Sequence, residues 1–130
     1  VLFIVTNQSG IGRGYYTKHT VEKLHAWIKK ELKKHGVTIN EIYYCPHRPE
    51  DGCTCRKPGY GLLLQAVQEY GVNLSKSWVV GDQWSDIAMG RMANVRTVKI
   101  GSKKREVGIT TRAHFHVQNL KEAVDIITKK

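Results

Sequence analysis

Residues 1–14 read VLFIVTNQSGIGRG, and the class of fold follows from this stretch. Residues 1–5 are all apolar, which is typical of a strand buried on both faces of a parallel sheet. The run passes through Thr6 and Asn7 into a turn rich in glycine. A hydroxyl and successive backbone amides at a strand end suit a phosphate group. Because the same residues are common in ordinary turns, the pattern alone leaves both interpretations open.

Strand-like and helical patterns alternate through the rest of the chain. Apolar residues at helical spacing predict helices between the cap Thr17 and Gly36, over 62–70, over 85–93 and over 120–127. Short strand-like segments are predicted over 41–44, 78–80, 95–100 and 113–117. This alternation predicts an α/β fold, a Rossmann-like parallel sheet with helices on both faces. Ligands of such folds bind beyond the carboxyl ends of the strands. We expect residues 1–130 to form a single domain.

The chain is strongly basic, with a net charge of +10 and a pI of about 9.7. A balance of this size favours anionic partners such as phosphate esters or nucleic acid. The cations are spread over 18–34, 48–57 and 91–112 without a dense block, so a solvated basic surface is an equal alternative. No apolar run approaches the roughly 20 residues of a membrane span, and no secretory signal is visible, although the chain begins with Val1. We expect no membrane partner.

All three cysteines lie within residues 45–55, which read CPHRPEDGCTC. Cys45 and His47 form one pair and Cys53 and Cys55 another, and four such ligands suit tetrahedral zinc with no open position. The predicted zinc is therefore structural, in a reducing, cytoplasmic compartment. A redox pair lacks its usual C-x-x-C spacing, and an iron–sulfur cluster more often has a fourth thiolate. Reduced thiols in an ordinary loop remain the main alternative.

Two further loops carry charged residues at predicted strand ends. Asp82 opens a G-D-x-x-x-D pattern directly after the apolar run 78–80, and carboxylates in this position bind hard cations such as Mg²⁺. The alternative is that one aspartate caps the following helix, and Asp86 fits that structural role. Lys57 follows the cysteine loop. A single lysine is usually a solvated surface charge, but its place among these loops favours contact with an anion.

Three stretches, VTNQSGIGRG, YYCPHRPEDGCTCRKP and WVVGDQWSDI, together resemble the haloacid dehalogenase superfamily of phosphatases, over nearly the whole chain. The cysteine loop joined directly to Arg-Lys-Pro resembles the loop of one subgroup of this superfamily, which acts on heptose 1,7-bisphosphate and histidinol phosphate. The NQSG-x-x-RG turn resembles the heptose-bisphosphate members more closely. The resemblance implies a Mg²⁺-dependent phosphomonoesterase that acts on a small phosphorylated sugar through an aspartyl-phosphate.

The resemblance also implies roles for individual residues. Thr6 and Asn7 match the motif that binds the transferring phosphoryl group, and Lys57 matches the lysine that neutralises charge on phosphate and nucleophile. Asp82 matches a Mg²⁺ ligand, and the four residues of the cysteine loop match the family's zinc ligands. Arg56 and Arg13 are expected to reach the rest of the substrate, including its second phosphate. These roles fit phosphoryl transfer, where catalysis is mostly positioning and charge stabilisation.

One family motif is missing from these residues. The family's nucleophile and acid/base form an Asp-x-Asp motif on its first strand, and the 130 residues contain no such pattern. The chain starts at what the family counts as its second strand, so we expect the first strand to be missing and the chain as given to be inactive. In the family that strand lies between the strands that match 1–6 and 78–80.

Without the first strand, buried backbone groups of its neighbours lose their hydrogen-bond partners, and each unpaired group costs about 1–3 kcal/mol of stability. A whole domain has only about 5–15 kcal/mol of stability. We therefore expect no direct pairing of residues 1–6 with 78–80, and no stable fold in the family's form without an upstream or substitute segment.

Three hypotheses of function remain. The first is the sugar-bisphosphate phosphatase, and the second is its sibling, a histidinol-phosphate phosphatase. The third is a non-catalytic, zinc-stabilised basic domain that binds phosphates or nucleic acid without turnover. No interleaving of aromatic and basic residues typical of single-strand binders stands out, which disfavours nucleic acid. We expect a monomer, or a chain completed by an N-terminal segment.

Overall fold

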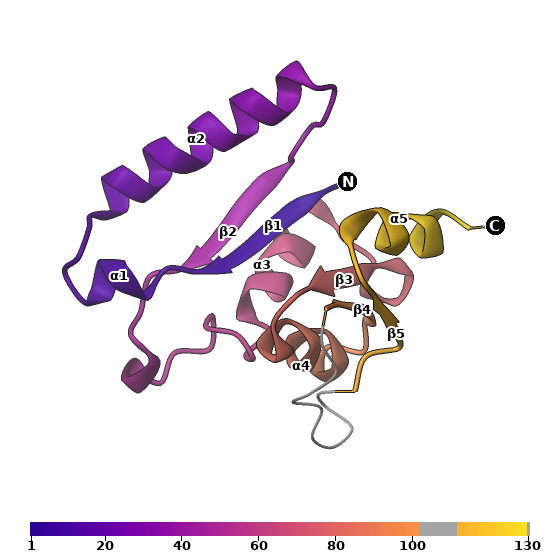
Figure 1. Cartoon of the computed structure of the whole chain (residues 1–130). Helices are drawn as coiled ribbons and strands as arrows, with labels where there is room; N and C mark the ends of the chain where they lie inside the picture. The colour runs from indigo at the N-terminus through magenta and orange to yellow at the C-terminus, as the bar shows by residue number, and fades with distance from the viewer. Residues whose placement is uncertain (102–111, 130) are drawn as a thin grey trace. The chain divides into compact units, whose positions relative to one another are not determined.

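The structure is a computed structural model that describes residues 1–101 and 112–129 (Figure 1). It divides into two units, Val1–Arg56 and Lys57–Lys130, which are treated separately below. None of the helices in these residues combines the length and the apolar character needed to cross a membrane.

The first unit is a two-stranded parallel sheet with one long helix. Its elements are β1 (Phe3–Asn7), α1 (Ser9–Gly12), α2 (Lys18–Lys34), β2 (Glu41–Cys45) and the 3₁₀ turn η1 (Pro49–Asp51). The strands pair from Phe3 opposite Glu41 to Asn7 opposite Cys45. The Thr17 side chain accepts a hydrogen bond from the backbone N–H of Thr20 at 3.2 Å, so α2 begins at the predicted cap.

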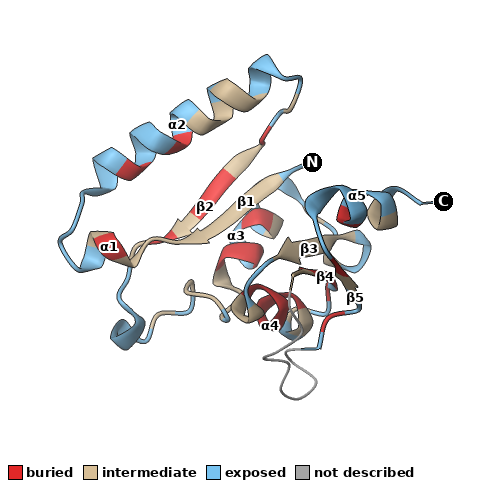
Figure 2. Ribbon diagram, viewed as in Figure 1, coloured by how far each residue is buried: buried red, intermediate tan, exposed pale blue. Residues whose placement is uncertain are grey.

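Helix α2 runs alongside the two strands of this sheet (Figure 1). The hydroxyl of Tyr44 in β2 donates to Glu22 at 3.0 Å, and the ring of His25 meets the Tyr44 ring edge-on, with centroids 5.4 Å apart. Val21 and His25 are buried, while the outward positions of the helix are mostly charged and exposed (Figure 2). This division is that of an amphipathic surface helix.

The second unit is a three-stranded parallel sheet with helices on both faces. Its elements are α3 (Gly61–Tyr70), η2 (Leu74–Lys76), β3 (Trp78–Gly81), α4 (Trp84–Met92), β4 (Arg96–Ile100), β5 (Phe115–Val117) and α5 (Leu120–Thr128), with the strand order β3-β4-β5. Successive residues of β4 face opposite sides. Thr97 lies against Gly90 of α4, whereas Val98 packs with Val117 and with Ala123 of α5.

These elements confirm the predicted α/β class, with every strand pair parallel. The helix α1 and the two 3₁₀ turns are additions that the apolar pattern did not indicate. In the described residues β1 pairs with β2 and β3 pairs with β4, in two separate sheets. The expectation that residues 1–6 do not pair directly with 78–80 stays a prediction, because the two segments belong to different units. The single domain, the monomer and the low stability of the chain alone stay predictions.

Candidate active site

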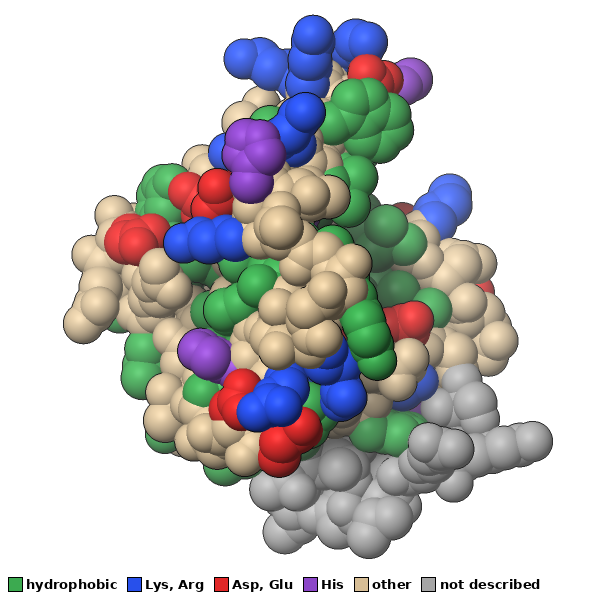
Figure 3. All heavy atoms as spheres, turned by 90° about the vertical axis from the view of Figure 1, so that its left-hand side faces the viewer, with side chains coloured by type: hydrophobic (Ala, Val, Ile, Leu, Met, Phe, Trp, Pro, Cys, Tyr) green, Lys and Arg blue, Asp and Glu red, His purple; other side chains and the backbone are tan. Residues whose placement is uncertain are grey.

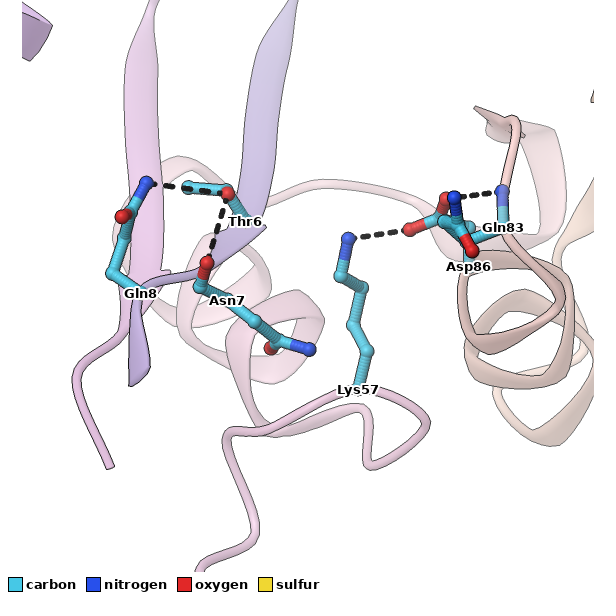
Figure 4. A network of polar contacts seen from close by, with 6 residues as sticks. All are labelled: Thr6, Asn7, Gln8, Lys57, Gln83 and Asp86. Atoms are coloured by element: carbon cyan, nitrogen blue, oxygen red, sulfur yellow. Dashed lines mark hydrogen bonds and ion pairs between the residues drawn. The ribbon is translucent and has the colours of Figure 1, made fainter. Parts of the chain in front are cut away.

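The end of β1 carries a short network of polar side chains (Figure 4). The Thr6 hydroxyl donates to the backbone carbonyl of Asn7 at 3.3 Å, and the Gln8 amide nitrogen donates to Thr6 Oγ1 at 3.5 Å. The hydroxyl of Tyr16 donates to Gln8 Oε1 at 2.8 Å. The predicted phosphate-binding residues Thr6 and Asn7 thus lie at a strand end, with Thr6 in contact with further polar groups.

The structure places this turn beside the cysteine loop, within the first unit. The backbone N–H of Gln8 donates to the carbonyl of Cys45 at 2.7 Å, and the N–H of Gly12 donates to the carbonyl of Pro46 at 3.0 Å. A side chain on Gly12 would lie 3.0 Å from that carbonyl oxygen, so the close approach favours glycine there. Two predicted sites that are far apart in the sequence therefore share backbone hydrogen bonds.

The four predicted metal ligands come together in one cluster. The sulfurs of Cys45, Cys53 and Cys55 and a ring nitrogen of His47 all lie within 4.8 Å of one another. The Cys45 sulfur is 2.8 Å from that of Cys55 and 3.4 Å from that of Cys53, and all three thiols are free. Cys45 is buried, whereas His47 is exposed. Three thiols and an imidazole at such distances could hold a metal ion.

The thiols influence one another's protonation. Burial raises the pKa of Cys55 to about 12, reinforced by hydrogen bonds with Cys45 and Cys53. Burial acts in the same direction on Cys53, but hydrogen bonds from Cys45, from the backbone of Arg56 and from Cys55 outweigh it and lower its pKa to about 7. Of the three thiols, Cys53 therefore loses its proton most readily, and the thiolate is the form in which cysteine binds metals.

Local hydrogen bonds shape the loop between the two ligand pairs. The Asp51 carboxylate accepts a hydrogen bond from the backbone N–H of Arg48 at 2.8 Å and an ion-pair contact from its guanidinium at 3.3 Å. The backbone hydrogen bond is the main reason why the pKa of Asp51 is lowered. Gly52 follows with φ of +67°, a conformation that glycine adopts without strain. These features reverse the chain between His47 and Cys53.

In the second unit, Lys57 forms an ion pair with Asp86 (Figure 4). The Lys57 ammonium lies 2.5 Å from Asp86 Oδ1, and each side chain is only 11% exposed. The other oxygen, Oδ2, accepts the backbone N–H of Gln83 at 3.1 Å at the start of α4. Asp86 therefore has the capping role that the sequence suggested. Its contact with Lys57 was not predicted, because nothing in the sequence indicates which side chains meet over such a separation.

The remaining predicted residues differ in their surroundings. Asp82 directly follows β3 and is exposed, as a cation ligand at a sheet edge would be. Arg13 is exposed just after α1. Arg56 is half-buried, and its buried Nη1 has no hydrogen-bond partner in the described part of the chain. A buried guanidinium nitrogen without a partner is costly, so Arg56 is suited to bind an anion.

Comparison with known proteins places the chain in a family. The HAD-hydrolase-like family matches residues 54–123. A D-glycero-alpha-D-manno-heptose-1,7-bisphosphate 7-phosphatase of Campylobacter jejuni is 38% identical over 130 residues, which cover all of this chain and 73% of that protein. This chain belongs to the haloacid dehalogenase-like hydrolases. The predicted membership of this superfamily is thereby confirmed.

Other relatives of this haloacid dehalogenase-like chain have similar names. A probable D-glycero-D-manno-heptose-1,7-bisphosphate 7-phosphatase of Thermoplasma volcanium is 49% identical over 82 residues, 63% of this chain. The D-glycero-beta-D-manno-heptose-1,7-bisphosphate 7-phosphatase of Pseudomonas aeruginosa is 43% identical over 107 residues, 81% of this chain. The matches span 56% and 60% of the lengths of these two proteins.

Solved structures of the same superfamily agree with the fold. The D,D-heptose 1.7-bisphosphate phosphatase of B. bronchiseptica, complexed with magnesium and phosphate, is 33% identical with a TM-score of 0.71, over 75% of this chain and 55% of that one. A HAD-like phosphatase from Mesorhizobium loti has a TM-score of 0.81 at 24% identity, over 96% of this chain and 63% of that one, which supports the fold alone.

Proposed function

We propose that this chain carries most of a Mg²⁺-dependent phosphatase that releases the 7-phosphate of D-glycero-D-manno-heptose 1,7-bisphosphate. The observation that carries the proposal is the 38% identity to a phosphatase of this specificity over all 130 residues. The clustered ligands of the cysteine loop, followed two residues later by Lys57, support the same subgroup. The three relatives compared by sequence are named as heptose-1,7-bisphosphate 7-phosphatases, one of them as a probable one, which favours this substrate over histidinol phosphate.

In this proposal the residues of the chain bind and orient the phosphoryl group. The Thr6 hydroxyl and the amides around Asn7 donate hydrogen bonds to its oxygens, and Lys57 balances the negative charge that gathers there. In this structure Asp86 holds the Lys57 ammonium. A carboxylate in contact with the ammonium fixes the position of this cation, whose positive charge faces the phosphate in the proposed site.

The family resemblance assigns the nucleophile and the acid/base to an Asp-x-Asp pair, a pattern that these 130 residues do not contain. A carboxylate oxygen of the first aspartate attacks phosphorus, and the bond from phosphorus to the sugar oxygen breaks. The second aspartate gives its proton to that leaving oxygen. It then takes a proton from a water molecule, whose oxygen attacks phosphorus, and the aspartyl–phosphate bond breaks to release inorganic phosphate.

Two metal ions belong to the proposal. Asp82 is exposed at the end of β3 and supplies an oxygen ligand of the kind that Mg²⁺ prefers, which fits this cation. When bound, Mg²⁺ supplies positive charge beside the phosphate. Three sulfurs and one nitrogen within 4.8 Å fit Zn²⁺, with all four positions filled by protein, so we assign this ion a structural role.

We assign the second phosphate of the substrate to two arginines. The half-buried Arg56 has a buried Nη1 with no hydrogen-bond partner among the described residues, and a phosphate oxygen would satisfy it. Arg13 lies directly after α1, and α1 is hydrogen-bonded to the cysteine loop through Gly12.

A cytoplasmic location and a small-molecule partner rather than nucleic acid remain parts of the prediction. On the face shown in Figure 3, cations lie in several separate groups with acidic side chains between them.

The test is phosphate release by the whole protein from heptose 1,7-bisphosphate and from histidinol phosphate, with and without Mg²⁺. We expect release from the heptose substrate, loss of release without Mg²⁺, and a loss of at least about 100-fold in kcat/KM for Lys57→Met or Asp82→Asn. Lys76→Met is the matched control, because Lys76 is an exposed lysine of the same unit. Turnover of histidinol phosphate alone would assign the sibling activity, and no turnover of either would refute the proposal.

A further inference from the structure

Three donors at the end of β1 form a chain that runs in one direction. Tyr16 O–H donates to Gln8 Oε1, Gln8 N–H donates to Thr6 Oγ1, and the Thr6 hydroxyl donates onward to the carbonyl of Asn7, with donor–acceptor distances of 2.8, 3.5 and 3.3 Å. Figure 4 shows the last two of these contacts. The sequence indicated a role only for Thr6 and Asn7.

The direction follows from the chemistry of the amide. The Gln8 side chain has one oxygen and one NH₂ group, so the phenol that donates to the oxygen leaves the NH₂ end to face Thr6. A Thr6 oxygen that accepts from Gln8 must turn its own proton away. Because each hydrogen bond in such a chain polarises the next, the Thr6 hydroxyl becomes a better donor at the outer end.

The backbone holds Tyr16 in the place that this chain needs. A side chain on Gly10 would collide with the Tyr16 ring, so the ring lies against the bare backbone of α1. The backbone N–H of Tyr15 donates to the Gly10 carbonyl at 2.8 Å and fixes the return of the chain. The turn therefore brings a residue eight positions after Gln8 back to the Gln8 amide.

We propose that Gln8 and Tyr16 are positioning residues that aim the Thr6 hydroxyl proton at the transferring phosphoryl group. The inference rests on the proposed function, in which Thr6 binds that group. Gln8 occupies the acceptor side of Thr6, so a phosphoryl oxygen that replaces the Asn7 carbonyl as acceptor meets a proton already turned outward. The site gains preorganisation, because the contact with Gln8 excludes orientations of the Thr6 proton toward Gln8 before the substrate arrives.

The experiment is a double-mutant cycle in the whole protein, with inorganic phosphate and Mg²⁺ as the probe. Tyr16→Phe keeps the ring over Gly10 and removes only the donor, and Gln8→Met removes the amide at similar length. We expect each to weaken phosphate binding by about 2- to 10-fold, the range for loss of one hydrogen bond. In a Thr6→Val background, Tyr16→Phe should change the affinity by less than about 1.5-fold, because its effect passes through the Thr6 hydroxyl.

The neighbouring Tyr15→Phe is the matched control, because Tyr15 is exposed and contributes its backbone N–H rather than its hydroxyl. It should leave phosphate affinity unchanged. Equal losses from Tyr16→Phe with and without the Thr6 hydroxyl would overturn the inference. If Thr6→Val does not fold, the cycle between Tyr16→Phe and Gln8→Met serves the same purpose, and additive losses there overturn it.

Failure of the proposed function gives a different result. If Thr6→Val alone leaves phosphate binding unchanged, the assigned role of Thr6 is wrong, and the inference falls with it. If Thr6→Val weakens binding while Tyr16→Phe and Gln8→Met do not, the proposed function stands and only the positioning role is refuted. Urea unfolding of every variant separates a change in affinity from a change in stability.

Discussion

Replacement of Asp86 by asparagine tests the ion pair with Lys57. Asparagine has nearly the same shape and keeps an oxygen that can accept from the backbone N–H of Gln83, so the cap of α4 is largely retained. What is lost is the negative charge 2.5 Å from the Lys57 ammonium. The substitution therefore isolates the charge from the shape of the site.

The expected loss of stability in Asp86→Asn depends on how far the ion pair is buried. Exposed ion pairs contribute about 0–1 kcal/mol. Removal of one partner from a buried pair costs about 3–5 kcal/mol. With each side chain 11% exposed, this pair is closer to the buried case. Asparagine has a single acceptor oxygen, so when that oxygen keeps the hydrogen bond from Gln83, the NH2 group faces the Lys57 ammonium and cannot accept from it. We therefore expect a loss of about 3 kcal/mol, roughly 9–12 °C in Tm for a chain of this size.

The assay is urea and thermal unfolding of Asp86→Asn, Lys57→Met and the double variant. A coupling energy of about 1.5 kcal/mol or more between the two sites is expected, because they share one interaction. Asp125→Asn is the control: its partner Lys121 lies 3.8 Å away, and the two side chains are 89% and 68% exposed for Lys121 and Asp125. It should cost less than about 0.5 kcal/mol. Additive single losses, or equal losses at Asp86 and Asp125, would refute the reasoning.

Three further predictions concern other parts of the molecule. Burial, with the positive charges of Arg91 and Arg96, lowers the pKa of His114 below 6.5. Because the unfolded chain then binds the proton more readily, the free energy of unfolding in urea should fall as the pH drops below 6.5. The fall should be smaller in His114→Gln. Gly90→Ala should destabilise by about 1–3 kcal/mol in the same assay, because the new methyl group meets buried Thr97, and a second change, Thr97→Ser, should recover most of that loss. Cys55→Ser should lower bound zinc from one equivalent per chain by elemental analysis, and an unchanged zinc content would exclude Cys55 as a ligand.

The fold could be read largely from local patterns. The apolar run at 78–80 lies within β3, and the strand expected over 95–100 contains β4, in which Thr97, Val98 and Lys99 are all buried. The Thr17 cap and Gly36, with φ of +80°, bounded α2 as predicted. The helix α1 could not be predicted in this way, since it spans only Ser9–Gly12 and has no room for an apolar period.

In the candidate site too, local features could be predicted from the sequence, whereas contacts between distant residues could not. The four metal ligands lie within eleven residues, so their spacing alone could indicate a cluster. The contact of Lys57 with Asp86 spans 29 positions, and the Tyr16–Gln8 hydrogen bond depends on the path of the turn around Gly10. Such contacts are consequences of the fold. A sequence pattern can indicate candidate residues, but it does not show which of them are in contact.

The cysteine loop gains a second role from these contacts. From the sequence alone, the loop is expected to affect the chemistry only by positioning Arg56 and Lys57, which directly follow it. The structure adds a backward connection, because the carbonyls of Cys45 and Pro46 accept the N–H groups of Gln8 and Gly12. A metal that fixes Cys45 thereby also fixes the turn that carries Thr6. Removal of the proposed zinc by a chelator should therefore weaken phosphate binding through Thr6 as well as Lys57, which titration with inorganic phosphate before and after chelation would measure.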